Sequence, residues 1–366
     1  MYIYKKKIYI VLFSIVDLIG TVLMFSVRFF RKNQDKRSEK ILIIRADHIG
    51  DVVAATSVLG PLKRAYPEAE IDFLAPSWAK VILGENPYIK SFVEFDAPWF
   101  SRKRSNIMSW LEGINKMANI IKDRGYDTVI DLRGDFRQIT AMFLAGVKNR
   151  ISYGITGGGF LLTQCVRYKL GLHETERNTE LLKPLGIESP ISEPEIYLSE
   201  KDKSKAELLK KETGINNKYA VIHMVPGHST KKWDINKFRK VARYIRKEKK
   251  LKTVFVGSID DRGYINEVIE GENDIDTINL VGKTDLAVLG HILKDAFLFL
   301  GVDSGPSHIA AAVKVPGVIL FSGINDPNEW APRSEKMRII YPGEGKGLEC
   351  VLPEEVEQAI DEVLAS

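Results

Sequence analysis

One stretch of the sequence combines anion-binding side chains with a backbone pattern that would present them. Residues 297–312, FLFLGVDSGPSHIAAA, form an apolar block, break at Gly301, offer Asp303 and Ser304, and continue as an alanine-rich helical pattern. At the carboxyl edge of an open α/β sheet, the unpaired amides of such a helix's first turn favour a diphosphate. Taken alone, the stretch equally fits helix capping by Asp303 and Ser304, with His308 packed against the sheet.

A second loop carries hydroxyl and ammonium groups. Residues 226–233, PGHSTKKW, directly follow a predicted strand. Ser229, Thr230 and Lys231 can bind phosphate there together with backbone amides. Turn chemistry is an equally good explanation of this loop by itself.

A third loop adds two carboxylates at the same predicted sheet edge. Asp260 and Asp261 follow the next strand, where they can accept hydrogen bonds from ribose hydroxyls. Gly305, at the first loop, lets an anion approach the backbone closely. Three successive strand ends with complementary groups favour a nucleotide diphosphate site over separate helix caps, and we count His308 among its candidate contacts.

These loops lie on alternating strand and helix patterns, which predict doubly wound parallel sheets. The predicted strands are 41–45, 70–74, 91–95, 127–132, 219–225, 251–256, 296–300 and 317–321. The predicted helices include 51–66, 200–213, 235–249, 260–269, 284–295, 305–314 and 353–365. We therefore expect two Rossmann-like domains facing a cleft, over residues 38–213 and 214–366.

Composition is compatible with two domains and indicates neither a zinc site nor a disulfide framework. The chain has 366 residues, of which 45% are hydrophobic, and its formal net charge of +5 suits phosphates or a membrane surface without implying nucleic acid. Cys165 and Cys350 show neither a CxxC spacing nor a nearby histidine cluster, so a reducing compartment is the simpler interpretation.

Residues 1–37 are predicted to attach the protein to a membrane. An apolar run over 8–27 lies between basic clusters, and it is long enough to cross a bilayer. Asp17 in its middle argues against a simple span, so a helix lying in the interface stays open, as does a buried soluble helix. The larger basic cluster on the C-terminal side predicts a cytoplasmic location at the inner membrane.

The motifs together resemble the family-9 glycosyltransferases, the ADP-heptose:lipopolysaccharide heptosyltransferases. The resemblance rests on RADHIGDVVAATSVLGPLKRAYP near the start, and on PGHSTKKW, GSIDD, NLVGKTDL and GVDSGPSHIAAA followed by VPGVILF. It implies a GT-B fold, with the acceptor bound by the N-terminal domain and ADP-heptose by the C-terminal domain. It also implies a lipopolysaccharide core or other lipid-linked glycan as acceptor, reached from the inner membrane.

The resemblance also assigns roles to residues. The positions matching the donor site are Lys231 for the phosphates, Asp260 or Asp261 for the ribose, Asp303 near the transferred sugar, and Ser304 and Gly305 for the diphosphate. Asp51 matches the proposed catalytic base, although a helix N-cap is its plain alternative. Transfer would then invert the anomeric centre without a cofactor or metal, and the Asp274–Asp276 DxD pair is interpreted as solvated. The loop residues Asp47 and His48 depart from the small hydroxyl residues common in the family.

Two other functions fit the same sequence. One is a transferase of this fold that uses another nucleotide sugar or acceptor. The other is a non-catalytic nucleotide-sugar or glycan-binding protein, which would be expected to lack Asp51 or Lys231. A nicotinamide dehydrogenase is disfavoured because the first strand is followed by ADHIGD and not by GxGxxG.

Overall fold

The structure is a computed structural model, and it describes residues 7–29, 38–101, 106–188, 192–215, 218–227, 231–270 and 276–365. The chain divides into two compact units, Met1–Ser192 and Glu193–Ser366. The boundary after Ser192 lies earlier in the chain than the expected boundary at 213/214. It does so because helix α8 (Glu200–Glu212) packs on α11 (Leu286–Lys294) and therefore belongs to the second unit. A 2.8 Å ion pair between Lys210 and Asp295 helps to hold α8 there.

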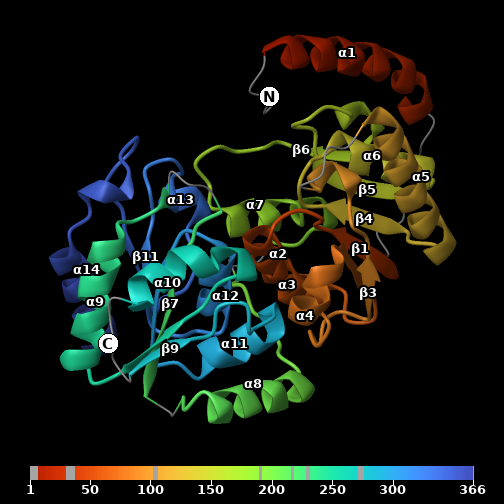
Figure 1. Ribbon diagram of the computed structural model, residues 1–366. Coiled ribbons are helices and arrows are strands. Elements are labelled where there is room, and N and C mark those ends of the chain that lie inside the picture. Colours follow the sequence, from red (N-terminus) through yellow and green to blue (C-terminus); the bar gives the residue numbers. More distant parts are fainter. Residues whose placement is uncertain are drawn as a thin grey trace. The chain divides into compact units, whose positions relative to one another are not determined.

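The first unit is built on a six-stranded parallel sheet (Figure 1). Its strands are β1 (Lys40–Ile44), β2 (Glu70–Ala75), β3 (Ser91–Glu94), β4 (Thr128–Asp131), β5 (Asn149–Tyr153) and β6 (Gln164–Val166). The order β3-β2-β1-β4-β5-β6 is that of a Rossmann sheet. Residues 41–44 of β1 are completely buried, as expected for a central parallel strand covered on both faces.

Helices connect these strands and cover the sheet. They are α2 (Ile49–Ala55), α3 (Leu59–Ala65), α4 (Lys80–Leu83), α5 (Ile107–Arg124), α6 (Phe136–Leu144) and α7 (Glu174–Glu180). The single helix expected over 51–66 is interrupted by a 3-10 turn at Thr56–Val58. There the hydroxyls of Thr56 and Ser57 donate to the carbonyls of Val53 and Ala54, and such side-chain bonds compete with regular helix geometry.

The N-terminal helix α1 (Lys7–Phe29) contacts the 3-10 turn at Gly159–Leu161, and its only acidic residue, Asp17, lies at this contact. Asp17 Oδ1 accepts a 2.8 Å hydrogen bond from the amide of Gly158, and Gly20 lies against the ring of Phe160. In the described parts of the chain, no helix reaches the combined length and hydropathy that crossing a bilayer requires. The spanning alternative for residues 8–27 therefore finds no support.

The second unit repeats the same topology. Its parallel strands are β7 (Tyr219–His223), β8 (Lys252–Phe255), β9 (Thr277–Asn279), β10 (Leu298–Val302), β11 (Gly317–Leu320) and β12 (Met337–Ile340), in the order β12-β11-β10-β7-β8-β9. Its other helices are α9 (Ile235–Lys247), α10 (Arg262–Glu270), α12 (Gly305–Ala312), α13 (Pro327–Trp330) and α14 (Pro353–Ala365). Phe238, Val241 and Ile245 lie on one face of α9 and are buried in the core of this unit. The expectation of two Rossmann-like folds is confirmed.

Candidate functional site

Each sheet has one place where the direction of strand progression reverses. In the first unit it lies between β1 and β4, and in the second between β7 and β10. Ligands of open α/β sheets bind at the carboxyl ends of the strands beside such a point. The residues that follow these four strands therefore define two candidate half-sites, one in each unit.

In the second unit, the residue after β10 forms an ion pair with a predicted phosphate ligand. Lys231 Nζ contacts Asp303 Oδ2, and both side chains are largely buried. Asn325 Nδ2 also donates to Asp303 Oδ2 at 3.3 Å. The structure thus brings together a lysine and an aspartate that lie 72 positions apart in the sequence.

Trp233, two residues after Lys231, anchors the segment that carries this lysine. The indole of Trp233 is buried, and its Nε1 donates to the carbonyl of Val351 at 3.1 Å. Its ring packs edge-on against Phe238, and Tyr264 donates to its carbonyl at 3.0 Å. The ammonium of Lys232 lies over the Tyr264 ring, 4.6 Å from the centroid, so the two adjacent lysines have different surroundings.

Ser304 is held by a buried histidine that the sequence did not single out. Ser304 occupies the N-cap position of α12, but its side chain makes no capping bond. Its Oγ lies 3.1 Å from His223 Nδ1 and donates to the carbonyl of Val302 at 3.0 Å. Burial lowers the pKa of His223 to about 4, so its ring is neutral at physiological pH. Capping alone therefore does not explain Ser304.

The other residues predicted to bind the donor have different surroundings. Asp261 Oδ2 accepts hydrogen bonds from the amide and hydroxyl of Ser258, at 2.8 and 2.6 Å, whereas the side chain of Asp260 is exposed. Gly305 begins α12, and His308 lies one turn further on, half-buried. Ser229 and Thr230 lie outside the described residues.

In the first unit, Arg45 follows β1 and is the centre of a buried ionic network. Its Nε lies 2.8 Å from Asp47 Oδ1, one terminal nitrogen lies 2.6 Å from Asp51 Oδ1, and the other lies 2.7 Å from Glu174 Oε1. Burial alone would lower the pKa of Arg45, but these three carboxylates keep it above its ordinary value. Arg133, which follows β4, binds the second oxygen of Asp47.

Asp51, the predicted base, is held by two cationic or protonatable partners. Its Oδ1 binds Arg45, and its Oδ2 lies 3.3 Å from Nδ1 of His48. Burial alone would raise the pKa of Asp51, but Arg45 and the hydrogen bond from His48 outweigh burial and hold the pKa well below its ordinary value. The same hydrogen bond raises the pKa of His48. Asp51 is therefore ionised throughout the physiological range.

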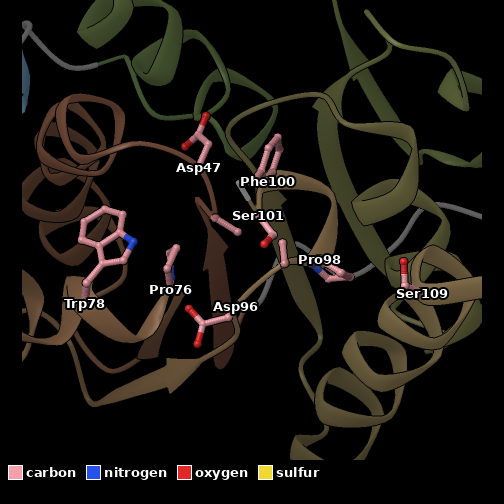
Figure 2. Close-up of a pocket in the computed structure, with 10 residues that line it drawn as sticks. Asp47, Pro76, Trp78, Asp96, Pro98, Phe100, Ser101 and Ser109 are labelled. Carbon is pink, nitrogen blue, oxygen red and sulfur yellow. The ribbon is translucent and has the colours of Figure 1, made fainter. Parts of the chain in front are cut away.

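A cavity of about 520 Å³ opens beside this network. It is lined by residues following β1, β2 and β3: Ala46, Asp47, Pro76, Trp78, Asp96, Ala97, Pro98, Phe100 and Ser101, together with Ser109 of α5. Figure 2 shows the Trp78 ring and the Asp96 carboxylate bordering it. Asp96 is fixed by the amide of Ser77, which donates to Oδ1 at 3.0 Å. Aromatic faces with carboxylates suit a sugar ring, which has apolar faces and hydroxyl donors.

Asp47, His48 and Asp51 also form a cluster of metal-ligand type, with one candidate ligand atom from each residue lying within 4.8 Å of the others. However, both oxygens of Asp47 and Oδ1 of Asp51 bind arginines. A cation would have to displace guanidinium groups, so these residues fit a metal poorly. Asp274 of the DxD pair lies outside the described residues.

The comparisons with known proteins identify the family of the chain. Residues 114–359 match the family described as Glycosyltransferase family 9 (heptosyltransferase). The chain is 30% identical over 302 residues to lipopolysaccharide heptosyltransferase 3 of Escherichia coli strain K12, covering 80% of this chain and 85% of that protein. It is 24% identical over 320 residues to lipopolysaccharide heptosyltransferase 2 of Salmonella typhimurium, covering 82% and 87%.

Two solved structures show the same fold. The family 9 glycosyl transferase from Veillonella parvula superposes with a TM-score of 0.79 at 22% identity, covering 91% of this chain and 99% of that one. The ADP-heptose lps heptosyltransferase II of E. coli superposes with a TM-score of 0.74 at 22% identity, covering 89% and 98%.

Proposed function

The chain belongs to glycosyltransferase family 9, and on that premise we propose that it transfers a heptose from ADP-heptose to the core of a lipopolysaccharide. The relatives named as lipopolysaccharide heptosyltransferases align over four fifths of the chain, across both units. The single observation that carries the donor half of the proposal is the Lys231–Asp303 ion pair at the switch point of the second sheet. This pair supports the proposal, because ligands of open α/β sheets bind beside such a switch point, and a cation and a carboxylate suit a diphosphate and a sugar.

In the proposed donor complex, the diphosphate competes with Asp303 for the ammonium of Lys231. The first turn of α12 at Ser304 and Gly305 supplies backbone donors, with Ser229, Thr230 and His308 as further contacts. Asp303 is then free to accept hydrogen bonds from the sugar. Either Asp260 or Asp261 binds the ribose hydroxyls.

Transfer then proceeds with inversion at the anomeric carbon and without a metal or cofactor. The acceptor hydroxyl attacks opposite the diphosphate and loses its proton late, at the centre formed by Asp51. Lys231 stabilises the charge that builds on the leaving diphosphate.

We propose the cavity beside Asp47 as the acceptor site. Trp78 offers an apolar ring for the face of a core sugar, and Asp96 offers a carboxylate for its hydroxyls. The cavity lies at the same sheet edge as Asp51, because both follow the strands of the first sheet.

We also propose that α1 keeps the enzyme at the cytoplasmic face of the inner membrane by lying on the lipid surface. Asp17 and Gly20 face the protein. Other apolar residues of the helix are exposed: Val11, Ile15, Leu18, Ile19, Val22 and Leu23. Vesicle flotation tests this, since Leu18→Glu should weaken binding of the full chain to anionic vesicles. Equal flotation of both proteins would count against it.

The donor is tested by thermal unfolding of the full chain with a panel of nucleotides. A ligand at one hundred times its dissociation constant adds about 2.7 kcal/mol of stability. We expect ADP and ADP-heptose to stabilise the protein selectively. Stabilisation by uridine or guanosine nucleotides instead would point to a same-fold transferase with another donor. Stabilisation by ADP-heptose without any transfer would favour a non-catalytic binding protein.

A further inference from the structure

The two oxygens of Asp51 are not equivalent in their surroundings. Oδ1 binds the buried guanidinium of Arg45 at 2.6 Å, and Oδ2 lies 3.3 Å from Nδ1 of His48. The side chain of Asp51 is only 17% exposed, whereas that of His48 is 74% exposed. An acceptor arriving from solvent therefore reaches the imidazole more readily than the carboxylate.

The carboxylate of Asp51 is also a weak base. The pKa of its carboxyl is held well below the ordinary value by Arg45 and His48, although burial alone would raise it. The neighbouring imidazole of His48 is a stronger base than usual, because its hydrogen bond to Asp51 raises the pKa of His48. Three other charged groups face this imidazole or its partner, namely Asp47, Arg133 and Arg45, and of these Asp47 raises and Arg133 lowers the pKa of His48.

We propose that His48 receives the proton of the acceptor hydroxyl at Nε2, while Asp51 holds Nδ1–H and stabilises the imidazolium that forms. This rests on the proposed function, in which the acceptor loses its proton at the Asp51 centre, and it names the atom that takes the proton. Asp51 then acts through His48 as a positioning residue.

The step balances in protons and electrons. The acceptor oxygen forms a bond to the anomeric carbon as its O–H bond breaks, and the proton moves to Nε2 of neutral His48. The bond between the anomeric carbon and the diphosphate oxygen breaks, and ADP leaves with its electron pair. The exposed imidazolium then returns the proton to water, which restores the neutral ring.

The local geometry supports this division of labour. His48 occupies the N-cap position of α2, in extended conformation, but its side chain makes no capping bond to the helix backbone. Its ring is directed to Asp51 three residues later. Arg45 fixes Asp51 from the buried side, so the carboxylate oxygen that faces His48 has a defined position.

The test compares full-length wild type with His48→Ala, using ADP-heptose and a heptose-deficient lipopolysaccharide. We expect kcat to fall about 100-fold or more, with KM for ADP-heptose unchanged because the donor residues lie in the other unit. The wild-type rate should rise with pH as His48 loses its proton, and this acid limb should be absent in His48→Ala. Added imidazole should restore part of the variant's kcat while leaving the wild type unchanged.

The outcomes separate this inference from the function on which it depends. A His48→Ala protein with wild-type kcat and pH profile would overturn the role of His48 while leaving Asp51 as the direct base. A loss of kcat with neither imidazole rescue nor a changed pH profile would also overturn it, as a structural effect. If Asp51→Asn transferred heptose at the wild-type rate, that result would instead refute the proposed function's claim that the acceptor loses its proton at Asp51.

Discussion

Replacing Arg45 should destabilise the first unit severely. Arg45→Met keeps most of the side-chain volume but leaves Asp47, Asp51 and Glu174 without their shared cation. Removing one partner of a buried ion pair costs about 3–5 kcal/mol, because it leaves a buried charge uncompensated. In a unit of this size each kcal/mol shifts Tm by about 2–4 °C, so we expect the transition of the first unit to fall by roughly 6–20 °C.

Differential scanning calorimetry of the full chain measures this shift, and an exposed ion pair supplies the control. Lys240 pairs with Glu354, and both side chains are more than half exposed. Lys240→Met should leave Tm unchanged, since exposed pairs contribute little. If Arg45→Met unfolded at the same temperature as Lys240→Met, the network would not stabilise the fold and the reasoning from burial would be refuted.

Three further predictions concern the two half-sites. Burial holds the pKa of His223 at about 4 in the fold, so the unfolded chain binds an extra proton between about pH 4 and pH 6.5, and stability falls by up to about 3 kcal/mol as pH drops through this window. His223→Gln should remove that slope in denaturant unfolding. Lys231→Met should weaken ADP binding about 10–100-fold in calorimetry, while Lys232→Met, which alters the lysine over Tyr264, should not. Trp78→Ala should raise the acceptor KM up to about tenfold without changing ADP affinity.

The periodic parts of the fold could be predicted from the sequence. Buried central strands such as β1 and β7 are continuous apolar runs, and the helix α9 shows a clear apolar face. The strands β5, β6 and β12 were not predicted. The strands β6 and β12 are short and lie at the edges of their sheets, and β5 (NRISY) carries several polar residues, so all three resemble loops in the sequence. The family resemblance rested on motifs alone, and the match of residues 114–359 to the family confirmed it.

The candidate sites were predictable only in part. Asp303 directly follows β10, and Asp51 lies in the first turn of the helix after β1, so their positions at the sheet edges could be predicted. The partners that set their chemistry could not be, because Glu174 binds Arg45 from 129 positions away and α7 has no distinguishing motif. Arg45 gave one usable signal, since an arginine at the end of an apolar strand requires buried carboxylates.

Asp17 is another residue whose role could not be predicted from the sequence. In the sequence, Asp17 is a charged residue within an apolar run, and the sequence does not show which group binds its carboxylate. In the structure it accepts a hydrogen bond from Gly158, which is 141 positions away. Only the tertiary contact explains an acidic residue in this helix.

The most direct test of the central claim is a transfer assay with purified wild type and Asp51→Asn, ADP-heptose, and heptose-deficient lipopolysaccharide, read by the mass of the product. The wild type should add heptose and release ADP. Asp51→Asn should transfer heptose at least about 100-fold more slowly, while ADP still stabilises it against thermal unfolding, because the donor residues belong to the second unit. Heptose transfer by Asp51→Asn at the wild-type rate, or no transfer by a wild type that binds ADP-heptose, would contradict the account.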